Sequence, residues 1–188
     1  MIIQKEENHE DYLATCHHPQ QNRILKEKKL MLCIRWDQLD VVYYELFNPS
    51  KTITGTLYRT QLMRLSRALK EKRPHCYSRN DKIILLHDNA PPHVAVLVKT
   101  YLKTLDWEVL SHPQYSPDIA PSDYHLFRTM AHALSDQPFT SYEDIKKCVD
   151  FWIDSIDKEF FRLQTSDRIR TLPERWKKVV TSDGQYFY

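Results

Sequence analysis

A strand–helix–strand pattern in the middle of the chain places the strongest constraint on its fold. Residues Lys82–His87 (KIILLH) form a mostly apolar run of strand length, as expected for a strand covered on both faces. A Pro-Pro turn, an amphipathic helical pattern over Val94–Leu105 and a second short strand at Trp107–Leu110 follow. Such a unit within one sheet is parallel and right-handed, which predicts an α/β protein. The first strand delivers Asp88 to the carboxyl edge of the sheet, where such folds bind ligands.

The flanking segments supply further elements of an α/β fold. Leu30–Trp36 and Val41–Phe47 are rich in β-branched, aromatic and apolar residues around a short polar break, which predicts a β-hairpin. Apolar residues recur at helical spacing after Gly55 and predict an amphipathic helix that stops before Pro74. Three later helices are predicted through Tyr124–Leu134, after Ser141 and over Leu172–Val180. Met1–Lys29 is polar without helical or strand periodicity and is interpreted as an irregular arm.

Length and composition exclude several classes of protein. A chain of 188 residues with 41% hydrophobic residues suits one globular domain. No run approaches the roughly 20 apolar residues of a membrane span, and Met1–Leu30 lacks the apolar core of a signal peptide, so an intracellular protein is expected. The four cysteines show no CxxC spacing, which argues against a zinc knuckle or a disulfide framework. Only Gly55 and Gly184 occur, so glycine-rich phosphate loops are excluded.

Positive charge is concentrated in one segment. Thr56–Lys82 contains eight Lys or Arg residues against Glu71 and Asp81. Those predicted on the outer face of the helix after Gly55 are candidates for contacting a DNA phosphate backbone: Arg59, Arg64, Arg67, Lys70 and Arg73. A solvated helix face with no partner explains the same pattern equally well.

Two aspartates are candidates for metal-dependent chemistry. Asp88 follows a strand, and Asp123 lies 34 residues further on, in the first turn of a helix that Ser122 is expected to cap. Hard Mg²⁺ or Mn²⁺ ions favour carboxylate oxygens and leave room for water and phosphate, as phosphoryl transfer requires. The alternative is structural, because an aspartate after a strand often forms a turn and one at a helix start often caps it.

The sequence motifs around these aspartates resemble those of the catalytic domain of mariner-family (Tc1/mariner) DNA transposases, which have an RNase H-like mixed sheet. The matching motifs are LHDNAPPHVA, WEVLSHPQYSPDIAPSDYHLF, LPERWKKVV and SDGQYF, and the resemblance covers Leu30–Tyr188. It implies that Asp88 and Asp123 bind Mg²⁺ or Mn²⁺, and that His87, Asn89 and His93 flank the site and orient water or DNA. It further implies cleavage and strand transfer of DNA, transposon-end and target DNA as partners, a homodimer, and nuclear localisation.

The chain also departs from this family. The first catalytic Asp belongs to a TGDEKW-like motif that does not occur here, and Asp37 matches a hairpin position to which a turn role is assigned. The central strand that should carry this motif is therefore expected to be missing or incomplete, with Met1–Gln4 as its possible last residues. Residues 1–29 are interpreted as an arm, a possible remnant of the family's clamp loop, and residues 30–188 as a partial catalytic domain. The family's N-terminal helix-turn-helix region is also missing from this sequence.

These departures predict weakened metal binding and a chain that is inactive or nearly so. A non-enzymatic, transposase-derived module that binds DNA or protein through the basic helix is the alternative function. An unrelated metal nuclease is a third reading, which the number of coinciding family motifs disfavours.

Overall fold

A computed structural model describes residues 2–8, 30–47, 51–75, 82–112, 126–134, 139 and 141–162, with backbone alone for 2–8, 111 and 112. The strands are β1 (Ile2–Asn8), β2 (Met31–Trp36), β3 (Val41–Phe47), β4 (Ile84–Asp88) and β5 (Glu108–His112). The helices are α1 (Gly55–Lys72), α3 (Val96–Thr104), α4 (Arg128–Leu134) and α5 (Tyr142–Ser155). Ser122, Asp123 and the helix predicted over Leu172–Val180 lie outside the described residues.

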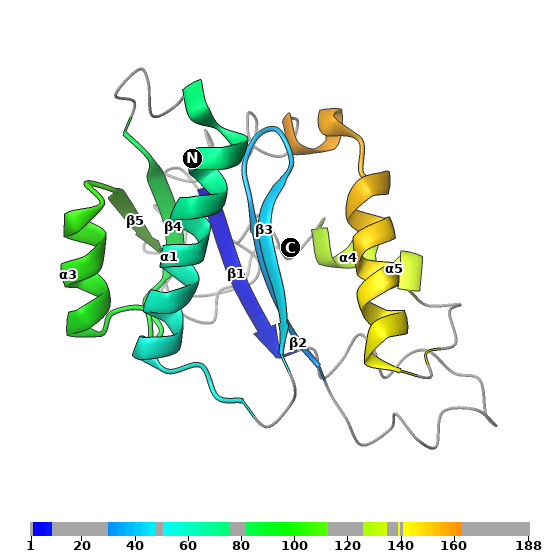
Figure 1. Cartoon of the computed structure of the whole chain (residues 1–188), viewed down its shortest axis with the longest axis horizontal. Coiled ribbons are helices and arrows are strands. Elements are labelled where there is room, and N and C mark those ends of the chain that lie inside the picture. The colour runs from blue at the N-terminus through cyan, green and yellow to red at the C-terminus, as the bar shows by residue number, and fades with distance from the viewer. Residues whose placement is uncertain are drawn as a thin grey trace, which may run out of the picture.

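The five strands form one mixed sheet in the order β3-β2-β1-β4-β5 (Figure 1). The predicted hairpin is confirmed, because β2 and β3 pair antiparallel from Met31↔Phe47 to Trp36↔Val41. The predicted parallel unit is also confirmed, since β4 and β5 pair in parallel through five residue pairs that end at Asp88↔His112. Asp88, at the carboxyl end of β4, is therefore still paired with β5 and belongs to the sheet rather than to a loop.

A central strand is present over Ile2–Asn8, which corrects the expectation that it would be missing or would end at Gln4. β1 pairs antiparallel with β2 along Ile3–Asn8 and parallel with β4 at Ile2↔Leu85 and Ile3↔Leu86. Residues 2–8 are thus not part of an irregular arm, whereas residues 9–29 lie outside the described residues. The physical reason is that β2 and β4 each present a row of backbone donors and acceptors that a strand between them must satisfy. A polar sequence such as IIQKEEN can therefore be a strand through pairing alone.

Side chains alternate between the two faces of the sheet and build a core on each. On β2, Leu32, Ile34 and Trp36 pack with α4 and α5, while Arg35 faces the ring of Tyr58 on α1. Figure 1 shows α4 and α5 together on one side of the sheet and α1 with α3 on the other. Helix α1 buries its predicted apolar stripe against the sheet: Tyr58, Leu62, Leu65 and Leu69. The molecule is therefore a three-layer α/β structure.

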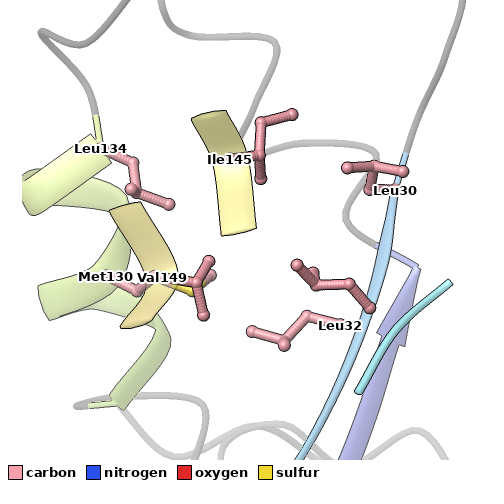
Figure 2. A pocket seen from close by; sticks show the side chains of 7 residues that line it. Leu30, Leu32, Met130, Leu134, Ile145 and Val149 are labelled. Carbon is pink, nitrogen blue, oxygen red and sulfur yellow. The ribbon is translucent and has the colours of Figure 1, made fainter. Parts of the chain in front are cut away.

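A small hollow in the core lies between the β2–β3 hairpin and helices α4 and α5. Figure 2 shows Leu30 and Leu32 facing Met130, Leu134, Ile145 and Val149 across it, and Leu46 completes the lining. Every lining side chain is apolar, and Met130 contributes the only sulfur. This hollow suits core packing and offers no charged or hydrogen-bonding group for chemistry.

The ends of the described helices follow their capping residues. Ser141 begins α5 with a capping box, in which its hydroxyl accepts from Asp144 N and the Asp144 carboxylate accepts from Ser141 N. Thr54 caps α1 by accepting from Leu57 N. None of the described helices combines the length and apolar character needed to cross a membrane.

Candidate metal centre at the carboxyl end of β4

Asp88 ends β4 and holds its carboxylate at the edge of the sheet. Its Oδ1 atom accepts a hydrogen bond from Ala90 N at 3.0 Å and lies 2.5 Å from His93 Nδ1. The Asp88 side chain is 34% exposed, whereas that of His93 is only 7% exposed. The carboxylate is therefore held from the protein side and remains accessible from the solvent side.

The two predicted flanking histidines belong to a buried aromatic cluster beneath Asp88. The hydroxyl of Tyr58, a fully buried residue of α1, lies 3.2 Å from His87 Nδ1. The Tyr58 ring also lies 4.2 Å from the His93 ring, centroid to centroid, and 6.0 Å from that of His87. His87 therefore points to the α1 side of the sheet. His93 is the histidine that contacts Asp88.

The remaining predicted site residues are placed differently. Asn89 is exposed directly after β4. Asp123 lies outside the described residues, so its distance from Asp88 stays a prediction. Within the described ranges no three His, Cys, Asp or Glu side chains gather into a metal site. On β1, the residues that pair in parallel with β4 are Ile2 and Ile3, opposite Leu85 and Leu86.

The basic face predicted for α1 is present in part. Arg59, Arg67 and Lys70 are exposed on the helix, and the Arg59 guanidinium lies 5.8 Å from the ring centroid of Tyr101 on α3. Arg64 is half exposed and forms an ion pair with Glu45 of β3. That pairing offsets part of the charge that Arg64 would offer to a phosphate.

Arg73 does not belong to this face, which corrects its inclusion among the DNA-backbone candidates. Its Nε lies 2.8 Å from Asp37 Oδ2, its Nη2 lies 2.7 Å from Asp40 Oδ1, and its side chain is only 12% exposed. The two carboxylates raise the pKa of the guanidinium, with the hydrogen bond to Asp37 as the largest cause. The turn role predicted for Asp37 is confirmed, because its Oδ1 accepts from Leu39 N and Asp40 N.

Sequence reasoning missed two buried residues next to the site. Tyr58 was predicted only as one apolar position of the α1 stripe, yet its hydroxyl and ring contact both histidines. Arg35 is fully buried on β2, with its guanidinium carbon 5.7 Å from the Tyr58 ring centroid. The available signal was the presence of polar groups within strongly apolar stretches, since a buried polar group usually has a partner.

Comparison with protein families and curated proteins identifies several relatives. Residues 12–79 match a family model described as Transposase (partial DDE domain). The chain is 52% identical over 159 residues to the Mariner Mos1 transposase of Drosophila mauritiana, which covers 85% of this chain and 45% of that protein. It is 34% identical over 164 residues to the human Histone-lysine N-methyltransferase SETMAR, covering 87% of this chain and 23% of that protein. The chain thus spans less than half the length of these curated relatives.

Solved structures give the same result over the whole chain. The crystal structure of the catalytic domain of Mos1 mariner transposase is 46% identical, with a TM-score of 0.79, covering 100% of this chain and 83% of that one. The catalytic domain with Raltegravir and Mg has the same identity and TM-score, covering 100% and 85%. A pre-cleavage Mos1 transpososome is 45% identical with a TM-score of 0.77, covering 100% and 56%.

Proposed function

The chain belongs to the mariner transposase family, as its RNase H-like catalytic domain, and we propose on that premise that it is built for metal-dependent DNA cleavage and strand transfer. The predicted family and fold class are thereby confirmed. The observation that carries the proposal is the position of Asp88, at the carboxyl edge of a mixed sheet with one side of its carboxylate accessible. Asp123 of the SDYHLF motif is proposed as the second ligand.

The Asp88 environment fits a hard divalent cation. Its carboxylate is an oxygen donor of the kind that Mg²⁺ and Mn²⁺ favour, and two hydrogen bonds to Oδ1 orient it. Related catalytic domains have been solved with Mg and with Mn, which shows divalent metal use in the family. A bound divalent ion supplies Lewis-acid stabilisation of a scissile phosphate and a more acidic water. The residues of this chain that would hold it are Asp88 and Asp123.

The partners follow from the same family. Mos1 has been solved as a paired-end complex and as a strand transfer complex, and we propose transposon-end and target DNA as the ligands of this domain. A homodimer and nuclear localisation are proposed on the same ground. Residues 30–188 together with β1 are proposed to form the domain, and residues 9–29 to correspond to the clamp loop.

We further propose that metal binding and activity of this polypeptide are weak. The family's first metal-binding Asp lies on the central strand, and the sequence of β1 is IIQKEEN, which contains no Asp. The lack of that carboxylate removes one oxygen ligand from the proposed site. Two carboxylates then have to hold the ions that three hold in the family.

A plasmid-nicking assay with Mn²⁺ tests this proposal. The parent chain should nick no faster than Asp88→Ala. The Lys5→Asp variant introduces an aspartate on β1 and should nick measurably, and Lys5→Asp combined with Asp88→Ala should not. Robust nicking by the parent that Asp88→Ala abolishes would overturn the proposed weakness, and nicking that survives Asp88→Ala would overturn the proposed site.

A second function, DNA binding without chemistry, is favoured by the exposed cations on α1. Arg59 and Arg67 stay exposed in the folded protein, and Lys99 and Lys103 are exposed on α3, the helix whose Tyr101 ring the Arg59 guanidinium approaches. Fluorescence anisotropy with a 30-base-pair duplex in EDTA, at several salt concentrations, measures this binding. Reversing Arg59 and Arg67 to Glu should lower the slope of log K against log salt by about two. Lys158→Glu with Arg162→Glu is the control, and equal losses in both double variants would argue against a specific α1 surface.

A further inference from the structure

The contact between His93 and Asp88 sets the orientation of the proposed metal ligand. Asp88 and His93 are five residues apart and are joined by the turn that follows β4. Across this turn His93 Nδ1 lies 2.5 Å from Asp88 Oδ1, so the two atoms are in direct hydrogen-bonding contact. An ionised carboxylate only accepts hydrogen bonds, so the Nδ1 atom must carry the proton.

A second donor converges on the same oxygen. Ala90 N donates to Asp88 Oδ1 at 3.0 Å, so two donors from one turn hold a single carboxylate oxygen. Rotating the carboxylate would break both hydrogen bonds. The turn itself is closed by His93 N, which donates to Ala90 O at 2.9 Å.

The His93 ring is in turn held by helix α1. The Tyr58 ring packs 4.2 Å from it, centroid to centroid, and Tyr58 is fully buried. The Tyr58 hydroxyl lies 3.2 Å from His87 Nδ1, and this contact links the Tyr58 side chain to β4, the strand that carries Asp88. His93 therefore has both a fixed backbone and a fixed ring, unlike an exposed histidine that merely lies near a carboxylate.

We propose that His93 is a positioning residue for Asp88: it binds Oδ1 through Nδ1–H and thereby presents the carboxylate to a divalent cation in one orientation. This inference rests on the proposed function, since it presupposes that Asp88 binds metal. Groups that hydrogen-bond to metal ligands commonly change metal affinity by about 10- to 100-fold when they are removed. A purely structural histidine would change the stability of the protein and leave its metal affinity untouched.

The test compares substitutions that differ only in where they place a donor. His93→Asn puts an amide N–H near the position of Nδ1, whereas His93→Gln puts it near the position of Nε2, and His93→Leu removes it. Mn²⁺ affinity of the whole chain is measured by titration calorimetry, and folding is checked by the melting temperature. We expect His93→Leu and His93→Gln to bind Mn²⁺ about 10-fold or more weakly than the parent, and His93→Asn to stay within about threefold. Equal Mn²⁺ affinity in all folded variants would overturn the inference.

A measurement without metal separates this inference from the proposed function. In histidine-labelled protein, the Nδ1–H proton of His93 should give a slowly exchanging NMR signal that is lost in Asp88→Ala. Absence of this signal in the parent would overturn the positioning contact itself. If the signal is present but the parent shows no Mn²⁺ binding that Asp88→Ala removes, the proposed metal site fails, and the role of His93 toward a metal fails with it.

Discussion

Arg73 joins the end of α1 to the turn between β2 and β3 through Asp37, with 2.8 Å between its Nε and Asp37 Oδ2. The same carboxylate closes the turn, because its Oδ1 accepts from Leu39 N at 2.8 Å and from Asp40 N at 3.1 Å. The Asp37 carboxylate thus binds both its own turn and Arg73, which lies 36 residues further along the chain. The contact fixes α1 over the sheet face on which Tyr58 reaches the two histidines.

Replacing Arg73 should therefore destabilise the fold. Arg73→Leu leaves Asp37 without its charged partner in a pair whose side chains are only 12% and 11% exposed, and should cost about 2–3 kcal/mol in the free energy of unfolding. Arg67→Leu on the exposed face of α1 is the matched control and should stay within about 0.5 kcal/mol. Urea unfolding measures both, and similar losses in the two variants would contradict the role of Arg73.

Gln61 offers a stabilising substitution. It is fully buried on α1, and neither its Oε1 nor its Nε2 has a hydrogen-bond partner in the described part of the chain. Gln61→Met keeps the length of the side chain and removes both buried polar atoms, so the free energy of unfolding should rise by about 1–3 kcal/mol. The exposed Gln38→Met is the control. A higher urea midpoint with an unchanged m-value is expected for Gln61→Met. Destabilisation would show that the Gln61 side-chain amide has hydrogen-bond partners in the folded protein.

Gly55 is required where α1 meets the turn that carries His93. A Cβ added at Gly55 would lie 2.8 Å from Ala95 Cβ and 3.5 Å from Pro92 O. Gly55→Ala should cost about 1–3 kcal/mol because the segment after the turn must shift. The double variant Gly55→Ala with Ala95→Gly removes the clash and should recover most of that loss, as measured by urea unfolding. An unchanged stability in Gly55→Ala alone would contradict the close approach.

Stability should fall at alkaline pH because of Tyr44. Burial raises the pKa of its hydroxyl above the ordinary value of 10.0, and the hydrogen bond that it donates to Asp150 raises it further. The folded state thus keeps a proton that the unfolded chain releases above about pH 10, so stability is present below that pH and is lost as pH rises further. Melting temperatures from pH 8 to 11.5 should fall less steeply for Tyr44→Phe than for the parent. Identical slopes would exclude this tyrosine as a cause.

Much of the fold could be predicted because its elements carry strong local patterns. The hairpin of β2 and β3, the amphipathic α1 and the parallel pair of β4 and β5 all follow from apolar periodicity and turn residues. The strand β1 could not be predicted from its own residues, since Ile2–Asn8 has two apolar residues followed by five polar ones. Its state is decided by two neighbouring strands that are remote in sequence.

The site could be predicted only in part for a related reason. The identity of Asp88 and its neighbours followed from family motifs, whereas the contact of His93 with Asp88 depends on a turn geometry that no motif specifies. The prediction for Arg73 is wrong because helical spacing alone cannot tell an exposed arginine from a paired one. Its partners Asp37 and Asp40 come close only when α1 packs on the hairpin. The role of Tyr58 was hidden because an apolar stripe does not reveal which hydroxyl has a polar partner.

The most direct test of the proposed metal centre is to locate Mn²⁺ by anomalous diffraction in crystals of the chain grown with MnCl₂. We predict a manganese peak roughly 2 Å from a carboxylate oxygen of Asp88, with Asp123 as a second ligand and no peak in Asp88→Ala. Saturating Mn²⁺ with no peak at Asp88, or a peak elsewhere that persists in Asp88→Ala, would contradict the account.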